Sequence, residues 1–391
     1  MNNIFKYNFI ISLLLLLAVC HLRAAECVVG AAQFDEYISL LQGKRVGITA
    51  NHTSLVGDKH LVDVLLERGI NIVGIYSPEH GFRGAADAGA HIASEIDAAT
   101  GIPIISLYGK NKKPRQEQLQ HIDYMVFDMQ DVGLRFFTYL STLHYVMEAC
   151  AEQHIPLLIL DRPNPNGFYV DGPVLESQHR SFVGMHPIPV VHGMTLGELA
   201  QMINGEGWLN NGAQCEVTII PCKYYTRQSL YRLPIKPSPN LPNMQAVYLY
   251  ASLCFFEGTA ISLGRGTEFP FQVFGHPDFK AVYSFSFTPK AVEGAINPPL
   301  KDKLCYGVDL RNYPENDLIS NPHIRLEWLL EAYKNFSKKG EFFTNYFTTL
   351  WGTARVQKMI EQGASEQQIR NSWKAEVERF LQQREKYLLY E

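Results

Sequence analysis

Four short apolar runs in the chain are each followed directly by polar residues that can do chemistry. The runs cover residues 72–76, 124–127, 157–160 and 188–191. A strand buried on both faces of a parallel sheet is typically a near-continuous apolar run of this length. Because parallel strands that alternate with helices bring their carboxyl ends to one edge of the sheet, we expect the residues after the four runs to surround one crevice.

Helical periodicity alternates with such runs over most of the chain. Helices are predicted over 34–41 and 59–68, and a longer one carries Tyr139, Leu143, Val146, Met147 and Cys150 at helical spacing. Thr195 and Glu198 fit a capping box, which predicts a helix over 196–204. Further strands are predicted at 44–50, 103–107, 216–220 and 247–255. This alternation predicts an α/β fold, with a Rossmann-like, mostly parallel sheet and flanking helices.

The pattern changes beyond about residue 278. A strand over 304–310 precedes three stretches with helical character, at 325–338, 352–362 and 365–387. We therefore predict a Rossmann-like catalytic domain over 26–277 and a smaller C-terminal α+β domain over 278–391. Two loops, the proline-rich 234–242 and the glycine-rich 258–275, are predicted between these elements, and the second is a candidate site loop.

The first 25 residues have the features of a secretory signal peptide. Lys6 precedes an apolar stretch over 10–19, which is too short to cross a bilayer comfortably. The string that ends at Cys20 resembles a lipobox with an unusual valine, and cleavage after Ala24 or Ala25 is the alternative. We expect an exported protein, periplasmic or lipid-anchored, without a transmembrane span.

Composition and missing motifs narrow the function. The 391 residues are 46% hydrophobic with a formal net charge of −4 and no basic block, which disfavours disorder and a nucleic-acid partner. The chain has no GxGxxG, no GxxxxGK[ST], no GxSxG and no HExxH. These absences disfavour nucleotide binding, serine hydrolysis and a zinc protease site, and we expect no cofactor.

Carboxylates at the predicted strand ends are the first candidates for catalysis. Glu79 is placed where apolar surroundings raise a carboxyl pKa, as a general acid requires, although it is as well placed to hold Arg83. His80 either orients Glu79, contacts substrate or makes a structural hydrogen bond. For Asp128 we favour a functional role, and for Asp131 the capping of a helix that starts near residue 134.

Arginine and aromatic side chains are candidates for substrate binding. Arginine binds carboxylates through a bidentate fork, and of Arg83, Arg135, Arg162 and Arg265 we expect one or two to contact an anionic ligand group. The alternative for Arg162 is an ion pair with Asp161 that holds its loop. Tyrosines such as Tyr108 and Tyr139 are able to stack on a sugar ring, but aromatic residues at helical spacing more often belong to a core. A less favoured hypothesis is a hard-metal site made of Glu79, His80, Asp128, Asp161 and His192.

Six strings in order along the chain resemble the exo-β-N-acetylmuramidase (NamZ-type) family, which was long grouped as a domain of unknown function. They are SPEHG at 77–81, FDMQDVG at 127–133 with Arg135 and Thr138–Tyr139, DRPNP at 161–165, HGMTLGE at 192–198, PSPNLP at 237–242, and EGT through GRGT at 257–267. The resemblance runs from about residue 44 to 277 and is less distinct beyond. Ala260 departs from it, because asparagine is usual there, and this departure puts one contact in doubt.

The resemblance implies an exo-acting glycosidase that releases N-acetylmuramic acid from the non-reducing end of peptidoglycan fragments. It also implies a cleft between a large Rossmann-like domain and a smaller domain, with Glu79 as the catalytic acid. Asp128 would activate water or orient the acetamido group of the substrate. Arg135 or Arg265 would bind the lactyl carboxylate. With His80 as a third catalytic candidate, the residues expected to bind substrate are Asn51, Arg83, Tyr108, Gln130, Arg135, Tyr139, Arg162, Asn164, His192, Arg265 and Thr267.

Two other function classes fit the same residues. In a non-catalytic exported sugar-binding protein, the cleft would hold the ligand with Glu79 as a hydrogen-bond acceptor. A metal-dependent hydrolase or deacetylase would use the hard-metal site. The partner expected for the exo-acting glycosidase is a MurNAc-GlcNAc glycan derived from peptidoglycan.

Overall fold

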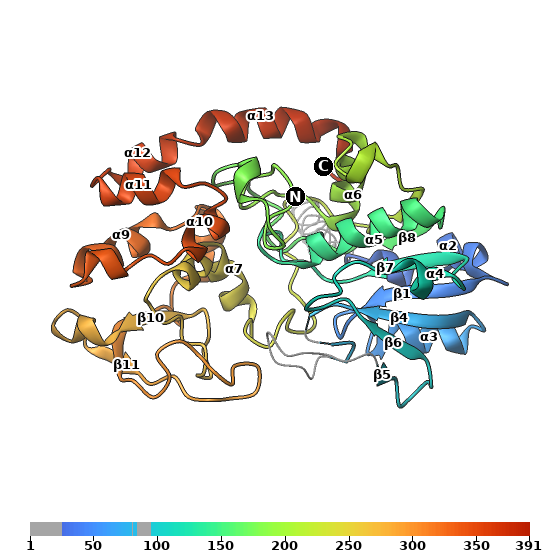
Figure 1. Cartoon of the computed structure of the whole chain (residues 1–391), viewed down its shortest axis with the longest axis horizontal. Coiled ribbons are helices and arrows are strands. Elements are labelled where there is room, and N and C mark those ends of the chain that lie inside the picture. The colour runs from blue at the N-terminus through green and yellow to red at the C-terminus, as the bar shows by residue number, and fades with distance from the viewer. Residues whose placement is uncertain (1–25, 80, 84–94) are drawn as a thin grey trace, which may run out of the picture.

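The computed structural model describes residues 26–79, 81–83 and 95–391 (Figure 1). The predicted leader over 1–25, with Cys20, and the catalytic candidate His80 lie outside the described residues. The strands are β1 Arg45–Ala50, β2 Leu55–Val56, β3 Lys59–His60, β4 Asn71–Ser77, β5 Glu95–Ile96, β6 Pro103–Ser106, β7 Tyr124–Asp128, β8 Leu157–Leu160, β9 Val217–Ile220, β10 Val273–His276, β11 Phe285–Phe287 and β12 Cys305–Asp309. The α-helices are α2 Phe34–Leu41, α3 Leu61–Glu67, α4 Gln116–Leu119, α5 Tyr139–Gln153, α6 Leu196–Gly205, α7 Met244–Leu253, α8 Glu315–Ser320, α9 Leu326–Asn335, α10 Tyr346–Trp351, α11 Arg355–Glu361, α12 Glu366–Asn371 and α13 Lys374–Arg384.

The larger sheet confirms the predicted α/β class. Within the described residues it has seven strands in the order β5-β6-β4-β1-β7-β8-β9, and only the pairing of β5 with β6 is antiparallel. Strand β1 lies between β4 and β7, so the polar residues that follow these three strands leave the sheet at the same edge. That is the edge at which ligands bind in open α/β sheets.

Both faces of this sheet are covered by helices, because alternate residues of each strand point to opposite sides. Met125 and Phe127 of β7 belong to the same core as α5 and α6, whereas Val126 between them belongs to a second core with α2 and α3. Burial on both faces explains why the central residues of these strands are mostly apolar on both sides of the sheet. The capping box predicted at Thr195 is present, and its hydroxyl accepts a hydrogen bond from the backbone N–H of Glu198 at the start of α6.

The C-terminal part has its own three-stranded sheet in the order β10-β12-β11, next to helices α8 to α13, which confirms a smaller α+β unit. Strand β10 precedes the predicted boundary at residue 277 and pairs with β12, so residues on both sides of that boundary build this sheet. The boundary itself stays a prediction.

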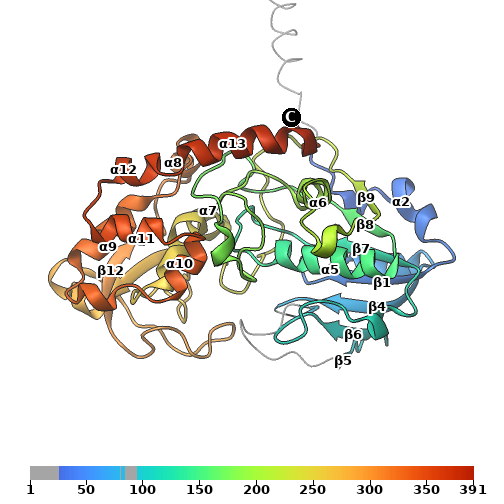
Figure 2. The same ribbon diagram turned by 45° about the horizontal axis from the view of Figure 1, so that its top comes forward.

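The C-terminus returns to the large sheet. Helix α13 runs along one side of the molecule from the other C-terminal helices to α6 (Figures 1 and 2). Beyond it, the Tyr390 hydroxyl donates a hydrogen bond of 2.6 Å to Oδ2 of Asp161, directly after β8. Asp161 also accepts hydrogen bonds from the Thr195 hydroxyl and the Gly197 backbone N–H. The last residues of the chain therefore fill part of the crevice at the carboxyl ends of the strands.

Two predicted strands are wrong. Residues 188–191 form only isolated bridges, from Val191 to Leu134 and Asp171. Pro189 within the run and Pro187 directly before it have no N–H to donate to a ladder. Residues 247–255 belong to α7 and to a 3₁₀ turn over Cys254–Gly258. An apolar run does not distinguish a buried strand from a helix that is buried on all sides, and the signal for the helix is the cap at Asn243, whose side chain accepts from the Ala246 N–H.

In the described ranges, no helix combines the length and the apolar character needed to cross a membrane.

Candidate active site

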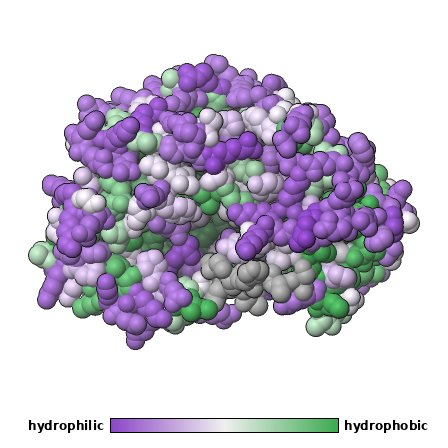
Figure 3. Space-filling model, in the orientation of Figure 1, coloured by the Kyte–Doolittle hydropathy of each residue, from purple (hydrophilic) through white to green (hydrophobic). Residues whose placement is uncertain are grey.

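A pocket of about 200 Å³ opens between the carboxyl edge of the large sheet and the C-terminal part. Figure 3 shows a hollow near the middle of the molecular face that Figure 1 presents. The walls of the pocket come from segments far apart in the sequence. They are the end of β4, the start of α5, the proline-rich loop, α7 with the following 3₁₀ turn, the glycine-rich loop, and α10. The lining residues are Glu79, Phe136, Phe137, Thr138, Tyr139, Val183, Ser238, Asn240, Tyr250, Cys254, Glu257, Arg265, Tyr346 and Leu350.

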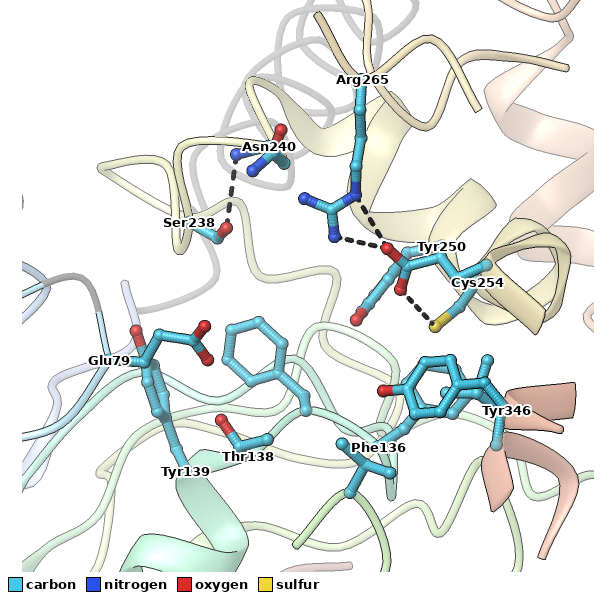
Figure 4. Close-up of a pocket in the computed structure, with 14 residues that line it drawn as sticks. Glu79, Phe136, Thr138, Tyr139, Ser238, Asn240, Tyr250, Cys254, Arg265 and Tyr346 are labelled. Carbon is cyan, nitrogen blue, oxygen red and sulfur yellow. Dashed lines mark hydrogen bonds and ion pairs between the residues drawn. The ribbon is translucent and has the colours of Figure 1, made fainter. Parts of the chain in front are cut away.

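Glu79 and Tyr139 lie side by side on one wall. The carboxylate of Glu79, two residues after β4, points into the pocket, and Tyr139 stands next to it at the start of α5 (Figure 4). Burial raises the pKa of Tyr139 above its ordinary value, and the negative charge of Glu79 raises it further. The hydroxyl therefore stays protonated at neutral pH, and it donates a hydrogen bond of 3.4 Å to the backbone carbonyl of Pro237 in the proline-rich loop.

An ion pair between Arg265 and Glu257 lies across the pocket from Glu79 (Figure 4). Nη2 of Arg265 is 2.6 Å and Nε is 2.8 Å from Oε1 of Glu257. Burial lowers the pKa of Arg265, but the carboxylate of Glu257 outweighs it and the net shift is upward. The guanidinium also lies over the ring of Phe271, 4.9 Å from its centroid. These contacts hold a permanent cation in an extended position on the wall.

Aromatic rings form much of the rest of the wall. Phe136 packs edge-on against Tyr250, with ring centroids 5.2 Å apart, and Phe137 packs in the same way against Tyr139 at 4.7 Å. Tyr346 of α10 brings a hydroxyl from the C-terminal part, and burial together with nearby carboxylates and Cys254 raises its pKa. The pocket thus combines apolar ring faces with a few polar groups, as ligand sites usually do.

Three of the predicted site residues meet in this pocket: Glu79, Tyr139 and Arg265. The others, apart from the undescribed His80, are not on its wall. They are Asn51, Arg83, Tyr108, Asp128, Gln130, Arg135, Arg162, Asn164, His192 and Thr267.

Asp128 and Arg162 are bound to each other. Asp128 is fully buried and Arg162 is nearly so, and the two form a bidentate pair in which Nη2 lies 2.9 Å from Oδ2. Nη2 also donates to the backbone carbonyl of Leu55. Arg162 therefore pairs with Asp128 and not with Asp161, and both groups hold the ends of β7 and β8 together. The predicted role of Asp128 toward water or the acetamido group finds no support in this position.

Arg135 is occupied by backbone carbonyls. Its Nη1 donates to Pro173 and Ile188, and its Nη2 donates to Leu350 and Trp351, with distances of 2.8 to 3.2 Å. Burial lowers its pKa to about 9. Of the two arginines expected to bind the lactyl carboxylate, Arg265 is therefore the one on the pocket wall.

The remaining candidates support loops. His192 is buried, its pKa is lowered to about 3, and its Nδ1 accepts from the Met194 N–H. The side chain of Gln130 donates to the backbone carbonyls of Asp131 and Pro163, and that of Asn164 donates to Met194. Further such contacts join Asn51 to Thr53, Thr267 to the Gly264 carbonyl, and Arg83 to Asp97 and Asp63. Tyr108 is half-buried.

Asp131 does not cap a helix, because α5 begins only at Tyr139. Its Oδ2 instead accepts a short hydrogen bond from the Gly133 backbone N–H in a tight turn, 2.6 Å long. Burial raises its pKa to about 7, although two backbone N–H groups act in the opposite direction. Its charge also contributes to the raised pKa of Tyr139.

The hard-metal hypothesis is not supported by the positions of its ligands. Asp128 is paired with Arg162, and Asp161 is bound by Thr195, Gly197 and Tyr390. Among the residues with assigned positions, the one group with metal-ligand spacing is His323, Glu327 and Glu366, and none of these was predicted. Arg370 pairs there with Glu366.

Sequence reasoning missed several residues of the pocket wall. Glu257 directly follows an apolar run and belongs to one of the strings that carry the family resemblance, and Ser238 and Asn240 belong to another. These strings were sufficient to find them. Tyr346 and Leu350 lie in α10, and no local pattern links that helix to the pocket.

Comparison with known proteins gives consistent matches over nearly the whole chain. Two family models match, described as "Exo-beta-N-acetylmuramidase NamZ, N-terminal" over residues 46–245 and "Exo-beta-N-acetylmuramidase NamZ, C-terminal" over 248–390. The peptidoglycan beta-N-acetylmuramidase NamZ of Bacillus subtilis (strain 168) is 38% identical over 376 residues, which is 91% of this chain and 89% of that protein.

Two solved structures from Bacteroides fragilis NCTC 9343 are also similar, both of DUF1343 family proteins. One is 52% identical with a TM-score of 0.88 and covers 94% of this chain and 99% of its own. The other is 29% identical with a TM-score of 0.78 and covers 93% and 99%.

Proposed function

The chain belongs to the exo-beta-N-acetylmuramidase NamZ family, and we propose that it releases N-acetylmuramic acid from the non-reducing end of peptidoglycan glycans with Glu79 as general acid. Membership of this family makes the protein a glycosidase. The proposal adds which bond it cleaves, the one to the terminal N-acetylmuramic acid, and which residue is the general acid, Glu79. The observation that carries it is the carboxylate of Glu79 in a ring-lined pocket, opposite a fixed arginine.

Glu79 has the position that the acid needs. Cleavage of a glycosidic bond requires a proton at the leaving oxygen while the sugar becomes oxocarbenium-like. Glu79 is half-buried on the pocket wall, where a terminal sugar would bring its glycosidic oxygen within reach. Tyr139 beside it keeps its own proton and donates it to the Pro237 carbonyl, so the hydroxyl oxygen is the atom able to accept a hydrogen bond from a sugar hydroxyl.

Arg265 gives the pocket its preference for muramic acid. The lactyl ether of this sugar ends in a carboxylate, which distinguishes it from N-acetylglucosamine, and a guanidinium binds a carboxylate with charge-assisted hydrogen bonds. Arg265 is the arginine on the wall, and Glu257 holds it in place. Glu257 is thus the second carboxylate on the pocket wall, where its contact with Arg265 holds the guanidinium.

The size of the pocket favours removal of one sugar at a time. A volume of about 200 Å³ suits one ring and its substituents, whereas endo-acting cleavage needs an open groove on both sides of the bond. The substrate lies in the cell envelope, so the proposal includes export of the protein. Residues 1–25 supply the expected signal.

Product analysis on a defined glycan tests the proposal. A MurNAc-GlcNAc tetrasaccharide labelled at its reducing end should lose one N-acetylmuramic acid, while the labelled remainder is shortened by one sugar. Labelled internal fragments without free N-acetylmuramic acid would contradict exo action. Activity that persists in a chelator supports the glycosidase, and activity abolished by the chelator and restored by a divalent metal would favour a metal-dependent hydrolase instead.

A further inference from the structure

A second cavity, of about 600 Å³, lies next to the pocket. We name it the Trp208 cavity. The segment 180–187 separates the two, because Val183 lines the pocket whereas Arg180, Met185 and Pro187 line the Trp208 cavity. Helix α5 also passes both: its first residue, Tyr139, lines the pocket, and His144, Tyr145 and Glu148 line the cavity. At a rise of 1.5 Å per residue, the two sites are roughly 8–14 Å apart along the helix.

The wall of this cavity is fixed from behind by buried polar groups. Nδ1 of His144 lies 3.0 Å from Nε2 of His186, and both rings are buried. The ring of His186 packs on the ring of Trp208, with centroids 5.2 Å apart. Burial lowers the pKa of both histidines, so the pair is neutral at neutral pH. Trp208 is therefore held in one position before any ligand arrives.

The loop that carries Trp208 is tied to α5. Oε2 of Glu148 accepts a 3.0 Å hydrogen bond from the backbone N–H of Asn210, and its Oε1 pairs with Lys113 at 2.7 Å. The Glu148 charge is thereby neutralised, and the loop offers the side chains of Asn210 and Asn211, both exposed, at the mouth of the cavity.

This set of side chains suits an N-acetylated sugar. Trp208 and Tyr145 are half-buried and provide flat apolar faces for the C–H side of a sugar ring. The asparagine amides are able to donate to and accept from hydroxyl and acetamido groups. Arg180 is exposed on the same wall and provides a cation for a lactyl carboxylate. Cleavage of a glycosidic bond at Glu79 does not by itself require that a sugar binds in the Trp208 cavity.

We propose that the Trp208 cavity is a secondary glycan-binding site, which holds the part of the strand beyond the sugar that is cleaved. This inference rests on the proposed function for its substrate, but it concerns a different set of residues. A strand bound at both places would dissociate more slowly than a single sugar, because the second contact is intramolecular once the first has formed. The enzyme should therefore prefer longer glycans over a single muramide.

Kinetics with two substrates test the inference. We compare kcat/KM for a MurNAc-GlcNAc hexasaccharide with kcat/KM for p-nitrophenyl N-acetylmuramide, which is too short to reach the cavity. Trp208→Ala should lower the ratio of the two values about tenfold, and Arg180→Ala should lower it by a smaller factor. Arg379→Ala, which removes an exposed arginine on α13, is the matched control and should leave the ratio unchanged.

A binding experiment keeps this test independent of catalysis. The four tryptophans of the chain are Trp208, Trp328, Trp351 and Trp373, and only Trp208 is not buried. Triacetylchitotriose should therefore change the tryptophan fluorescence of the Glu79→Gln variant with saturation, and Trp208→Ala in that background should abolish the change. Binding of triacetylchitotriose without any turnover of either substrate by the wild type would refute the proposed function, but it would still support glycan binding in the Trp208 cavity. A ratio unchanged in Arg180→Ala and in folded Trp208→Ala, or no saturable fluorescence change, would overturn the inference.

Discussion

Replacing Arg162 by methionine should destabilise the protein strongly, because the substitution leaves the carboxylate of Asp128 buried without its partner. Asp128 has no exposed surface, and its two oxygens face the guanidinium of Arg162. Breaking a buried pair by removing one partner costs about 3–5 kcal/mol, because the remaining charge is desolvated and uncompensated. We expect a loss of that order in the free energy of unfolding.

The double variant Asp128→Asn/Arg162→Met is the matched control. It removes both charges, so no uncompensated charge remains, and it should be more stable than Arg162→Met alone. Urea unfolding followed by circular dichroism measures both variants, and turnover of a muramide is measured per folded molecule. Removal of a general acid or base lowers turnover about 10²–10⁴-fold. If Asp128 has only a structural role, the turnover of the folded double variant should fall by much less than this.

Two results would refute this reasoning. Equal destabilisation of the single and the double variant would show that the buried charge of Asp128 does not dominate the loss. A double variant that is as stable as the wild type but inactive would show that Asp128 has a catalytic role, as the sequence predicted.

Three further predictions concern the site and its supports. Asp131 has a folded-state pKa of about 7, above the unfolded value, so its contribution to stability is full below about pH 4 and is lost as pH rises to 7. Asp131→Asn should therefore gain about 3 kcal/mol relative to the wild type between pH 4.5 and 7.5 in urea unfolding, and a pH-independent difference would contradict this. Arg265→Gln should raise KM for a muramide about 10–100-fold through the lost charge-assisted contact, and an unchanged KM would remove Arg265 from substrate binding. Tyr390→Phe should lower the free energy of unfolding by about 1–3 kcal/mol, because Asp161 loses a buried donor, and a thermal melt indistinguishable from wild type would show that this contact is dispensable.

The large sheet was predictable from the sequence because its strands are buried on both faces. Strands β1, β4, β7 and β8 are apolar at successive positions, and the helices between them show a different period. The same criterion failed at 188–191, where Pro189 and the preceding Pro187 exclude a ladder, and at 247–255, where a helix is buried on all sides. In both segments the residues that break or begin an element were more informative than the apolar run. They are the prolines in the first segment and the helix-capping asparagine before the second.

The site was predictable only in part, because residues with catalytic chemistry also support structure. Glu79 was found from its place after β4. Asp128, Arg162 and His192 have equally suitable positions in the sequence, but they bind one another or the backbone. The C-terminus adds Tyr390 to the crevice at the end of β8 by a contact with Asp161, and the pocket wall includes residues of α10. Its contribution from Tyr346 depends on long-range packing that no local pattern encodes.

The most direct test of the account is the effect of Glu79→Gln on two substrates that differ in their leaving group. On a MurNAc-GlcNAc disaccharide, kcat/KM should fall about 10²–10⁴-fold, because the sugar leaves only when it is protonated. On p-nitrophenyl N-acetylmuramide the loss should be much smaller, since nitrophenolate leaves without a proton, and Glu216→Gln, at an exposed glutamate, should match the wild type on both. Disaccharide cleavage by Glu79→Gln within a few-fold of wild type would contradict the role of Glu79.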